Sequence, residues 1–533
     1  MTDNWYQNAI FYEVYVRAYR DSNNDGNGDI PGLIEKLDYL KDLGVDCLWL
    51  LPMYPSPLKD DGYDIADYMH IHPDFGTIED LKKLLDEAHK RGIHVVADLV
   101  LNHTSDQHHW FQAALKDPSS PYKDYYVWSK TGKEFADARI IFVDTEPSNW
   151  TYSPEVGEYY WHRFFASQPD LNYRNPALQE EMLNVMRFWA KLGLDGFRAD
   201  AVPYLFEREG TNCENLPETH DYLKKIRKVL DAEFPGRILL AEANQWPADV
   251  REYFGDGDEF TMAFHFPLMP RIYMAMKKGD PAPIQWAIEN TPSIPEGCQW
   301  CTFLRNHDEL TLEMVTPEER DWMWQQYAPD PKMKLNLGIR RRFAPLMDND
   351  PAKMRQAEAI LFSLPGTPII YYGDEIGMGD NIDLFDRNGV RTPMQWSAEA
   401  PNAGFSDSNR LYAPVINSPT YNPQKVNVAD QQKDPSSFLN FMKHLIRLRK
   451  ERSFLAGSQI KFIDAGNPSV LCYLREDGSR RMMALHNLGE DTVSVALAGV
   501  LDVSPRKELL TNTVIPQGSE SIQLKAHQSA WLE

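Results

Sequence analysis

The chain lacks the usual features of secreted, membrane-spanning and nucleic-acid-binding proteins. Its five cysteines are an odd number without regular spacing in 533 residues, which excludes a disulfide framework. No uninterrupted apolar run reaches the roughly 18 residues that span a bilayer, and Met1–Trp5 contains neither a basic nor an apolar leader segment. Positive charge is scarce, because 55 Lys and Arg face 78 Asp and Glu, a formal net charge of −23. We therefore expect a cytoplasmic protein that binds neither nucleic acid nor membrane.

Two clusters of metal-type side chains are more typical of packing than of a metal site. Cys298-x-x-Cys301 leads into an apolar run and has no second pair to complete a zinc site. His108 and His109 abut Trp110 in a loop, so zinc binding together with His103 is disfavoured.

Short apolar, β-rich runs alternate with helical patterns along most of the chain. Alternation of this kind indicates parallel strands joined by right-handed crossovers, and eight strands close a (β/α)8 TIM barrel. Helical patterns separate them, for example one that begins at Thr77 with Asp80 three residues later and stops at Gly92. The predicted strands are 10–16, 47–51, 94–100, 196–200, 238–243, 259–266, 301–305 and 368–372.

Three segments do not fit plain crossovers. Residues 104–174, after the third strand, are polar and aromatic, and 311–354, after the seventh, read as a charged helical insert. Insertions at these strand ends lie over the active-site face of a barrel, so both are candidate lids. Within the second, Arg340–Arg342 suggests a solvated helix face or ion-pair partners. Residues 451–533 resemble a separate antiparallel β-sandwich, which leaves 1–103 and 175–450 for the barrel.

Three acids stand at the ends of predicted strands. Asp200 and Arg198 leave the same face of strand four, Glu242 closes strand five and Asp308 follows strand seven. Cleavage of an acetal needs a proton donor and a facing carboxylate, about 5–5.5 Å apart in retaining enzymes. We predict that Arg198 keeps Asp200 ionised as nucleophile, while apolar surroundings keep Glu242 protonated as general acid.

These motifs resemble those of the α-amylase superfamily of glycoside hydrolases and transglycosylases. The match runs through Asp98-x-x-x-Asn102-His103, Gly196–Asp200, Glu242, Asn306–Asp308 and, in the first insert, Gln168–Asn172. The resemblance implies that Asp200 is the nucleophile, Glu242 the acid/base and Asp308 the carboxylate that holds sugar hydroxyls. It also implies that His103, Gln168, Arg198 and His307 line one glucose subsite. Its far side would be closed by Asp60, Tyr63 and Arg391, with Arg391 paired to Asp60.

The same resemblance implies structural calcium at one or two sites and no organic cofactor. Asp21-x-Asn23-x-Asp25-Gly26-Asn27-Gly28-Asp29 spaces oxygen ligands like a calcium loop, although a solvated turn has the same composition. Magnesium is an alternative occupant. A second calcium between barrel and insert would be held by Asn102, Asp170, Glu207 and the carbonyls of Tyr204 and Leu205.

Longer strings resemble those of the maltose-isomerising members of the superfamily. They are 208–216, 242–247 and 304–311. The resemblance implies conversion of maltose to α,α-trehalose with some release of glucose. An α-glucosidase or oligo-1,6-glucosidase, a sucrose isomerase and a non-catalytic relative are the alternatives. The sequence leaves open whether the chain forms homo-oligomers and whether a maltose kinase binds it.

Overall fold

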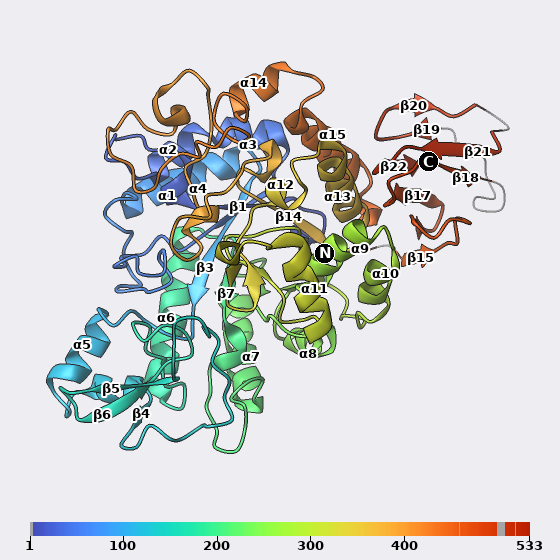
Figure 1. Ribbon diagram of the computed structural model, residues 1–533. Helices are drawn as coiled ribbons and strands as arrows, with labels where there is room; N and C mark the ends of the chain where they lie inside the picture. Colours follow the sequence, from blue (N-terminus) through green and yellow to red (C-terminus); the bar gives the residue numbers. More distant parts are fainter. Residues whose placement is uncertain (1–3, 458, 498–506, 517–518) are drawn as a thin grey trace.

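The computed structural model describes residues 4–457, 459–497, 507–516 and 519–533. Residues 1–3, part of the N-terminal segment on which the cytoplasmic expectation rests, lie outside this range. Eight parallel strands close a barrel in the order β1-β14-β10-β9-β8-β7-β3-β2, which confirms the predicted fold class (Figure 1). The strands are β1 (Phe11–Val14), β2 (Cys47–Leu50), β3 (His94–Val100), β7 (Gly196–Asp200), β8 (Ile238–Ala241), β9 (Met262–Phe264), β10 (Gln299–Phe303) and β14 (Thr367–Tyr371).

Helices surround the barrel and bury their apolar faces against it. The predicted capping box is present, because the Thr77 hydroxyl accepts from the Asp80 N–H while the Asp80 carboxylate accepts from the Thr77 N–H. Among the described residues, no helix combines the length and apolarity needed to cross a bilayer. The helices are α1 (Val16–Tyr19), α2 (Ile30–Glu35), α3 (Leu37–Leu43), α4 (Ile78–Lys90), α6 (Pro176–Leu192), α7 (Pro217–Glu233), α8 (Pro247–Arg251), α9 (Leu268–Lys278), α10 (Ala282–Glu289), α13 (Pro351–Ser363), α14 (Val428–Lys433) and α15 (Phe438–Glu451).

The segment between β3 and α6 projects from one end of the barrel as a small domain (Figure 1). It contains α5 (His109–Lys116) and a sheet in the order β4-β6-β5, formed by β4 (Trp128–Ser129), β5 (Trp150–Ser153) and β6 (Glu158–Trp161). Trp150 and Trp161 form its core with ring centroids 4.9 Å apart.

The insert after β10 is less helical than its composition suggests. It contains a three-stranded sheet, β11-β13-β12, and one longer helix. The arginine triplet is not on a solvated helix face: Arg341 pairs with Asp380 at 2.9 Å, and the fully buried Arg342 pairs with Asp374 at 3.2 Å. The elements are β11 (Leu310–Thr311), α11 (Pro317–Tyr327), β12 (Lys334–Leu335), β13 (Gly338–Ile339) and α12 (Phe343–Leu346).

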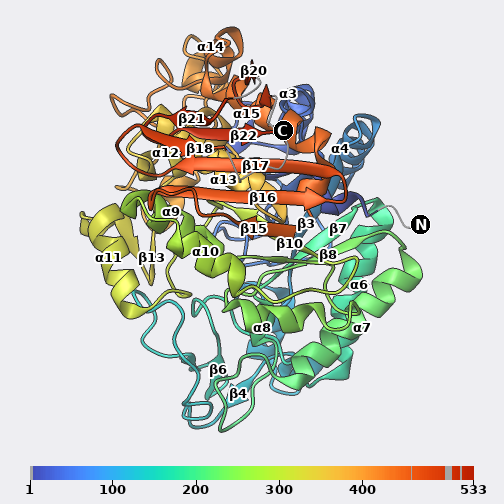
Figure 2. The ribbon, with the colours of Figure 1, turned by 90° about the vertical axis from the view of Figure 1, so that its right-hand side faces the viewer.

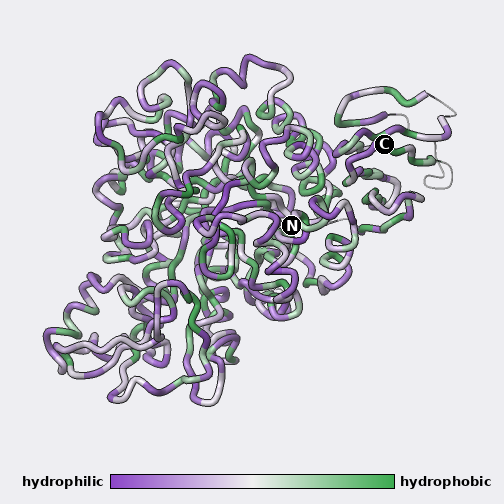
Figure 3. The backbone as a smooth tube through the Cα atoms, viewed as in Figure 1, coloured by the Kyte–Doolittle hydropathy of each residue, from purple (hydrophilic) through white to green (hydrophobic). Residues whose placement is uncertain are grey.

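The C-terminal domain is antiparallel and lies across one side of the barrel (Figure 2). A six-stranded sheet and a two-stranded sheet enclose an apolar cluster that includes Leu485 and Leu524. Hydrophobic residues concentrate along the interior of the barrel and its helices (Figure 3). The strands are β15 (Gln459–Phe462), β16 (Val470–Asp477), β17 (Arg480–Asn487), β18 (Val493–Ala496), β19 (Lys507–Glu508), β20 (Thr513–Val514), β21 (Ser521–Leu524) and β22 (Ser529–Leu532).

Candidate active site

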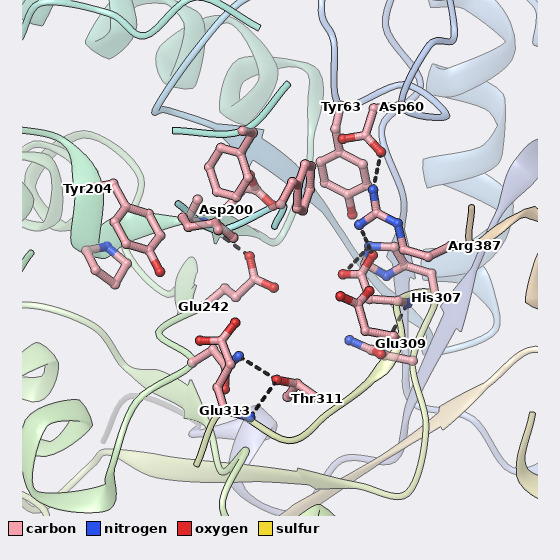
Figure 4. Close-up of a pocket in the computed structure, with 18 of the residues that line it drawn as sticks. Asp60, Tyr63, Asp200, Tyr204, Glu242, His307, Glu309, Thr311, Glu313 and Arg387 are labelled. Atoms are coloured by element: carbon pink, nitrogen blue, oxygen red, sulfur yellow. Dashed lines mark hydrogen bonds and ion pairs between the residues drawn. The ribbon is translucent and has the colours of Figure 1, made fainter. Parts of the chain in front are cut away.

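One pocket gathers the three predicted acids at the carboxyl ends of the barrel strands (Figure 4). Asp200 ends β7, Glu242 follows β8 and Asp308 follows β10. Parallel strands all end at one rim of the barrel, so residues more than 100 positions apart in sequence converge. The lining also includes Asp60, Tyr63, His103, Phe142, Phe164, Tyr204, Asn244, His307, Glu309, Thr311, Glu313 and Arg387.

Arg198 lies beneath the acids and contacts more of them than the sequence predicts. Its guanidinium is 2.6 Å from Asp200, 2.7 Å from Glu242 and 2.5 Å from Asp98. Asp98 belongs to a motif recognised in the sequence, but its ion pair with Arg198 follows from the parallel register that places the two residues side by side. One cation therefore serves three carboxyl groups.

The two central acids differ in pKa in the predicted order. Burial raises the pKa of Glu242 to about 8, against the attraction of Arg198, and the carboxyl shares a hydrogen bond with Asp200. Burial also raises the pKa of Asp200, to about 6, although Arg198 opposes the shift. Asp98 also repels the Asp200 charge, so the pKa of Asp200 lies above its usual range even though Arg198 lowers it. Near neutral pH, Asp200 is ionised and Glu242 holds a proton.

Asp308 is held by two arginines that enter after β14. Arg387 and Arg391 both contact its Oδ1 oxygen, at 2.7 and 2.9 Å. Burial works against ionisation, but His307 and the two guanidiniums hold the pKa of Asp308 well below its usual range. Asp308 is therefore a permanent negative charge in the pocket wall.

The predicted pairing of Arg391 with Asp60 is wrong. Arg387 contacts Asp60 at 2.6 Å, whereas Arg391 contacts Asp61 at 2.9 Å. A single helical turn, Asn388–Val390, separates the two arginines, and both contact Oδ1 of Asp308. Sequence motifs alone could not separate two arginines four positions apart.

The remaining predicted subsite residues surround the same pocket. Gln168 donates to Asp60 at 2.9 Å, which joins the insert to the wall formed by Arg387. The Tyr63 ring stacks on His307 at 5.2 Å, with 8° between the ring planes. His103 is buried and contacts the Tyr63 carbonyl at 3.2 Å. Burial lowers the pKa of His103 to about 3, so its ring is neutral.

Three segments that contribute to the pocket wall contact one another, and we call them the roof: the two inserts and the loop that contains Glu214. Arg139 of the first insert bridges Glu214 and Glu313, each at 2.8 Å. The Asn336 N–H donates to Asp144 at 2.7 Å, and the Arg387 guanidinium lies 5.3 Å from the centre of the Phe142 ring. The two inserts are the segments predicted to be lids, but none of these contacts could be predicted from the sequence.

The predicted loop Asp21–Asp29 is a compact turn in which the buried acids have protein partners. Both oxygens of Asp21 accept backbone N–H groups, from Asn24 at 2.7 Å and Gly26 at 2.8 Å. Asp29 accepts from the Gly32 N–H at 2.6 Å as the N-cap of α2. Asn23, Asp25 and Asn27 are linked by hydrogen bonds along the turn. No buried side-chain oxygen of this loop lacks a hydrogen-bond partner.

The junction between barrel and insert fits a cation better. Asn102 Oδ1, Asp170 Oδ2 and Glu207 Oε1 are buried oxygens without a hydrogen-bond partner. Burial raises the pKa of Asp170 to about 8 and that of Glu207 well above its usual range, and Asp170 contributes to the Glu207 shift. An oxygen-coordinated divalent cation would relieve both effects. The other predicted ligands are the carbonyls of Tyr204 and Leu205. Both residues are buried and lie two to three positions before Glu207 in the sequence.

Together the barrel and the paired carboxyl groups define a class of enzymes that cleave or transfer glycosidic bonds. Residues 13–328 and 339–457 match the family model "Alpha amylase, catalytic domain", and 460–531 match "Maltogenic Amylase, C-terminal domain". The chain belongs to the α-amylase family and groups with its trehalose synthases, so it is a sugar isomerase or transglucosylase.

Two curated relatives and one solved structure support this grouping. The trehalose synthase/amylase of Mycobacterium tuberculosis is 58% identical over 91% of this chain and 82% of its own length. The corresponding protein of Mycolicibacterium smegmatis is 60% identical over 89% and 81%. The crystal structure of a trehalulose synthase from Pseudomonas mesoacidophila is 28% identical, covers 99% of each chain and has a TM-score of 0.81.

Proposed function

We propose that this enzyme isomerises maltose to α,α-trehalose by a retaining double displacement in which glucose does not leave the pocket. The observation that carries the proposal is the contact between Asp200 and Glu242, with pKa values of about 6 and about 8. A carboxylate and a carboxylic acid that face each other from neighbouring strand ends are the two groups that a retaining mechanism needs.

In the first step, Asp200 attacks C1 of the non-reducing glucose of maltose. Glu242 gives its proton to the O4 oxygen of the leaving glucose, and the C1–O4 bond breaks as the bond from C1 to Asp200 forms. Asp308 holds hydroxyl groups of the transferred glucose, and its negative charge stabilises the oxocarbenium-like transition state. The closed wall of Asp60 and Arg387 supports binding of a terminal glucose unit.

In the second step, the released glucose turns and presents its anomeric hydroxyl to the same C1. Glu242, now ionised, removes the hydroxyl proton, and the new C1–O1 bond displaces Asp200. Two inversions at C1 retain the α configuration. The product is an α,α-1,1 linkage, and the enzyme returns to its starting protonation.

Containment of glucose decides between isomerisation and hydrolysis. The Arg139–Glu313 ion pair and the contact between Asp144 and Asn336 join the two inserts above the pocket. A retained acceptor reacts at a high effective concentration, whereas one that escapes is replaced by water. The Arg139 side chain is 36% exposed, so water can compete for its ion pairs and some glucose is expected to leak.

A product assay on maltose tests the proposal. Pure maltose should give trehalose as main product, and isotopically labelled glucose added to the medium should enter trehalose poorly. Glucose as sole product would instead establish an α-glucosidase, and efficient entry of external label would disprove containment. Sucrose in place of maltose tests the remaining isomerase alternative.

The roof gives a sharper form of the same assay. Arg139→Met removes both ion pairs and leaves a side chain of similar length. Glucose should then escape more often, so the ratio of glucose to trehalose should rise several-fold. Arg208→Met is a matched control, because Arg208 forms a single exposed pair with Glu218 outside the pocket.

We also propose a structural calcium ion at Asn102, Asp170 and Glu207, with the backbone of 204–205 completing its ligands. The unpartnered oxygens support it. When bound, the ion would supply positive charge that attaches the insert to the barrel. The loop Asp21–Asp29 is a weaker candidate for calcium or magnesium, because its buried carboxylates already have partners.

A further inference from the structure

Glu13 is an acid inside the barrel to which the proposed reaction gives no role. It lies on β1, in register with Trp49 of β2 and Tyr371 of β14, and is fully buried. Its Oε1 oxygen accepts the backbone N–H of His307 at 3.1 Å and contacts His307 Nδ1 at 2.5 Å. Its other oxygen, Oε2, is buried and has no hydrogen-bond partner in the described part of the chain.

The His307 ring lies between two carboxyl groups, one at each nitrogen. Nδ1 meets Glu13, and Nε2 is 3.2 Å from Asp308 Oδ2. Each of these contacts is a hydrogen bond only if a proton lies between nitrogen and oxygen. A neutral imidazole has one N–H group, so the second proton must come from a carboxylic acid or from an imidazolium ring.

The surroundings decide where the second proton is held. Asp308 is ionised, because Arg387 and Arg391 both contact it. Burial and the charges of three arginines, Arg391, Arg198 and Arg387, oppose an imidazolium ring, whereas Asp308 favours it. The opposing effects are larger, so the pKa of His307 is well below its usual range.

Glu13 itself is suited to hold the proton. Burial raises the pKa of Glu13 well above its usual range, and repulsion from Asp308 and Asp98 raises it further. The His307 N–H and Arg198 lower the pKa, but by less. An ionised Glu13 would also leave Oε2 as a buried anionic oxygen without a donor.

We propose that Glu13 is a neutral carboxylic acid whose O–H group donates a hydrogen bond to His307 Nδ1 and so fixes the ring as the Nε2–H tautomer. Nε2–H then donates toward Asp308 and the sugar hydroxyl that Asp308 holds. Glu13 is a positioning residue, since it reaches the substrate only through His307. Asp308 keeps its full negative charge because it only accepts from Nε2–H and carries no proton of its own.

The tautomer can be measured without any substrate. Full-length protein labelled with 15N-histidine is recorded by NMR near neutral pH, and the His307 signals are assigned by their absence in His307→Asn. We expect one unprotonated ring nitrogen, Nδ1, and one protonated nitrogen, Nε2. Two protonated nitrogens, or a proton on Nδ1 alone, would overturn the proposal.

Two substitutions at Glu13 test the consequence for activity, and this part rests on the proposed function. The NH2 group of Glu13→Gln can still donate to Nδ1, although it cannot also accept the His307 N–H, so kcat should fall at most a few-fold with an unchanged spectrum. Glu13→Met has similar length but no donor, so kcat should fall about 10- to 100-fold and the two tautomers should mix. Circular dichroism and thermal melting check that both variants fold.

Each other outcome has a definite meaning. Equal losses of kcat in both variants would show that the charge of Glu13 is required. No loss in either variant would show that Glu13 does not fix the tautomer of His307. Both outcomes contradict the proposal. If maltose gave no trehalose, the proposed function would fail while the nitrogen spectrum of His307 would still test Glu13.

Discussion

The active-site pocket and the junction between barrel and insert both bury acidic oxygens, but they differ in how the negative charge is balanced. In the pocket, Asp200 and Asp308 contact guanidiniums that belong to the chain. At the junction, Asp170 and Glu207 each keep a buried oxygen without a partner. An arginine is a permanent cation, whereas a bound ion can leave. The comparison indicates that the protein itself balances the charges of the pocket, whereas the charges at the junction would be balanced by the proposed ion.

Removal of the pocket nucleophile should have the largest effect. Asp200→Asn keeps the shape of the side chain but cannot form the covalent intermediate, so isomerisation and hydrolysis should both fall about 10⁴-fold or more. Product formation from maltose measures the loss, and the melting temperature should stay close to that of the parent. Asp321→Asn, at an exposed position on α11, is the matched control. Substantial residual turnover would mean that Asp200 is not the nucleophile.

Removal of a pocket arginine should reduce activity less than removal of Asp200, but it should still strongly impair substrate binding. Arg387→Met leaves Asp60 without its guanidinium and removes one of two contacts to Asp308. Breaking a buried ion pair costs about 3–5 kcal/mol, so kcat/KM should fall at least about 100-fold. Steady-state kinetics on maltose give the value. Arg391→Met leaves the ion pair between Arg387 and Asp60 intact and should raise KM less. If Arg391→Met raised KM more than Arg387→Met, the assignment of Arg387 as the partner of Asp60 would be wrong.

The pH profile should follow the two central acids. Below about pH 6 Asp200 gains a proton and loses nucleophilicity, and above about pH 8 Glu242 loses the proton that the leaving group needs. Activity should therefore decline about tenfold per pH unit on both sides, with the two acids titrating as a pair. The profile of kcat/KM measures both limbs. In Glu242→Gln the alkaline limb should disappear for an aryl glucoside that needs no protonation; its persistence would assign that limb elsewhere.

The junction should affect stability more than chemistry. Calcium at 100 times its Kd should stabilise the protein by about 2.7 kcal/mol, and EDTA should remove this gain. The double variant Asp170→Asn/Glu207→Gln removes the repelling charges, so its melting temperature in EDTA should equal or exceed that of the parent and should not respond to calcium. Asn23→Ala serves as the comparison in the other loop. Loss of the calcium response in Asn23→Ala alone would reverse the assignment of the two sites.

Local pattern was enough to predict the barrel and the positions of its acids. Strands and their ends follow from short-range periodicity, and the carboxyl ends of parallel strands must share one rim. Prediction was poorer where contacts join distant loops. Ion pairing was one of two alternatives for the arginine triplet, and the sequence did not identify Asp380 and Asp374 as the partners of Arg341 and Arg342.

The sequence by itself determined the fold class, the three acids and the two inserts, because each is written in residues close together along the chain. Only the tertiary structure decided that Arg387 and not Arg391 meets Asp60, that Arg198 serves three acids, and that Glu13 lies against His307. The physical reason is that an ion pair or a shared proton depends on distances of a few ångströms between residues hundreds of positions apart. Those distances exist only after the barrel has closed.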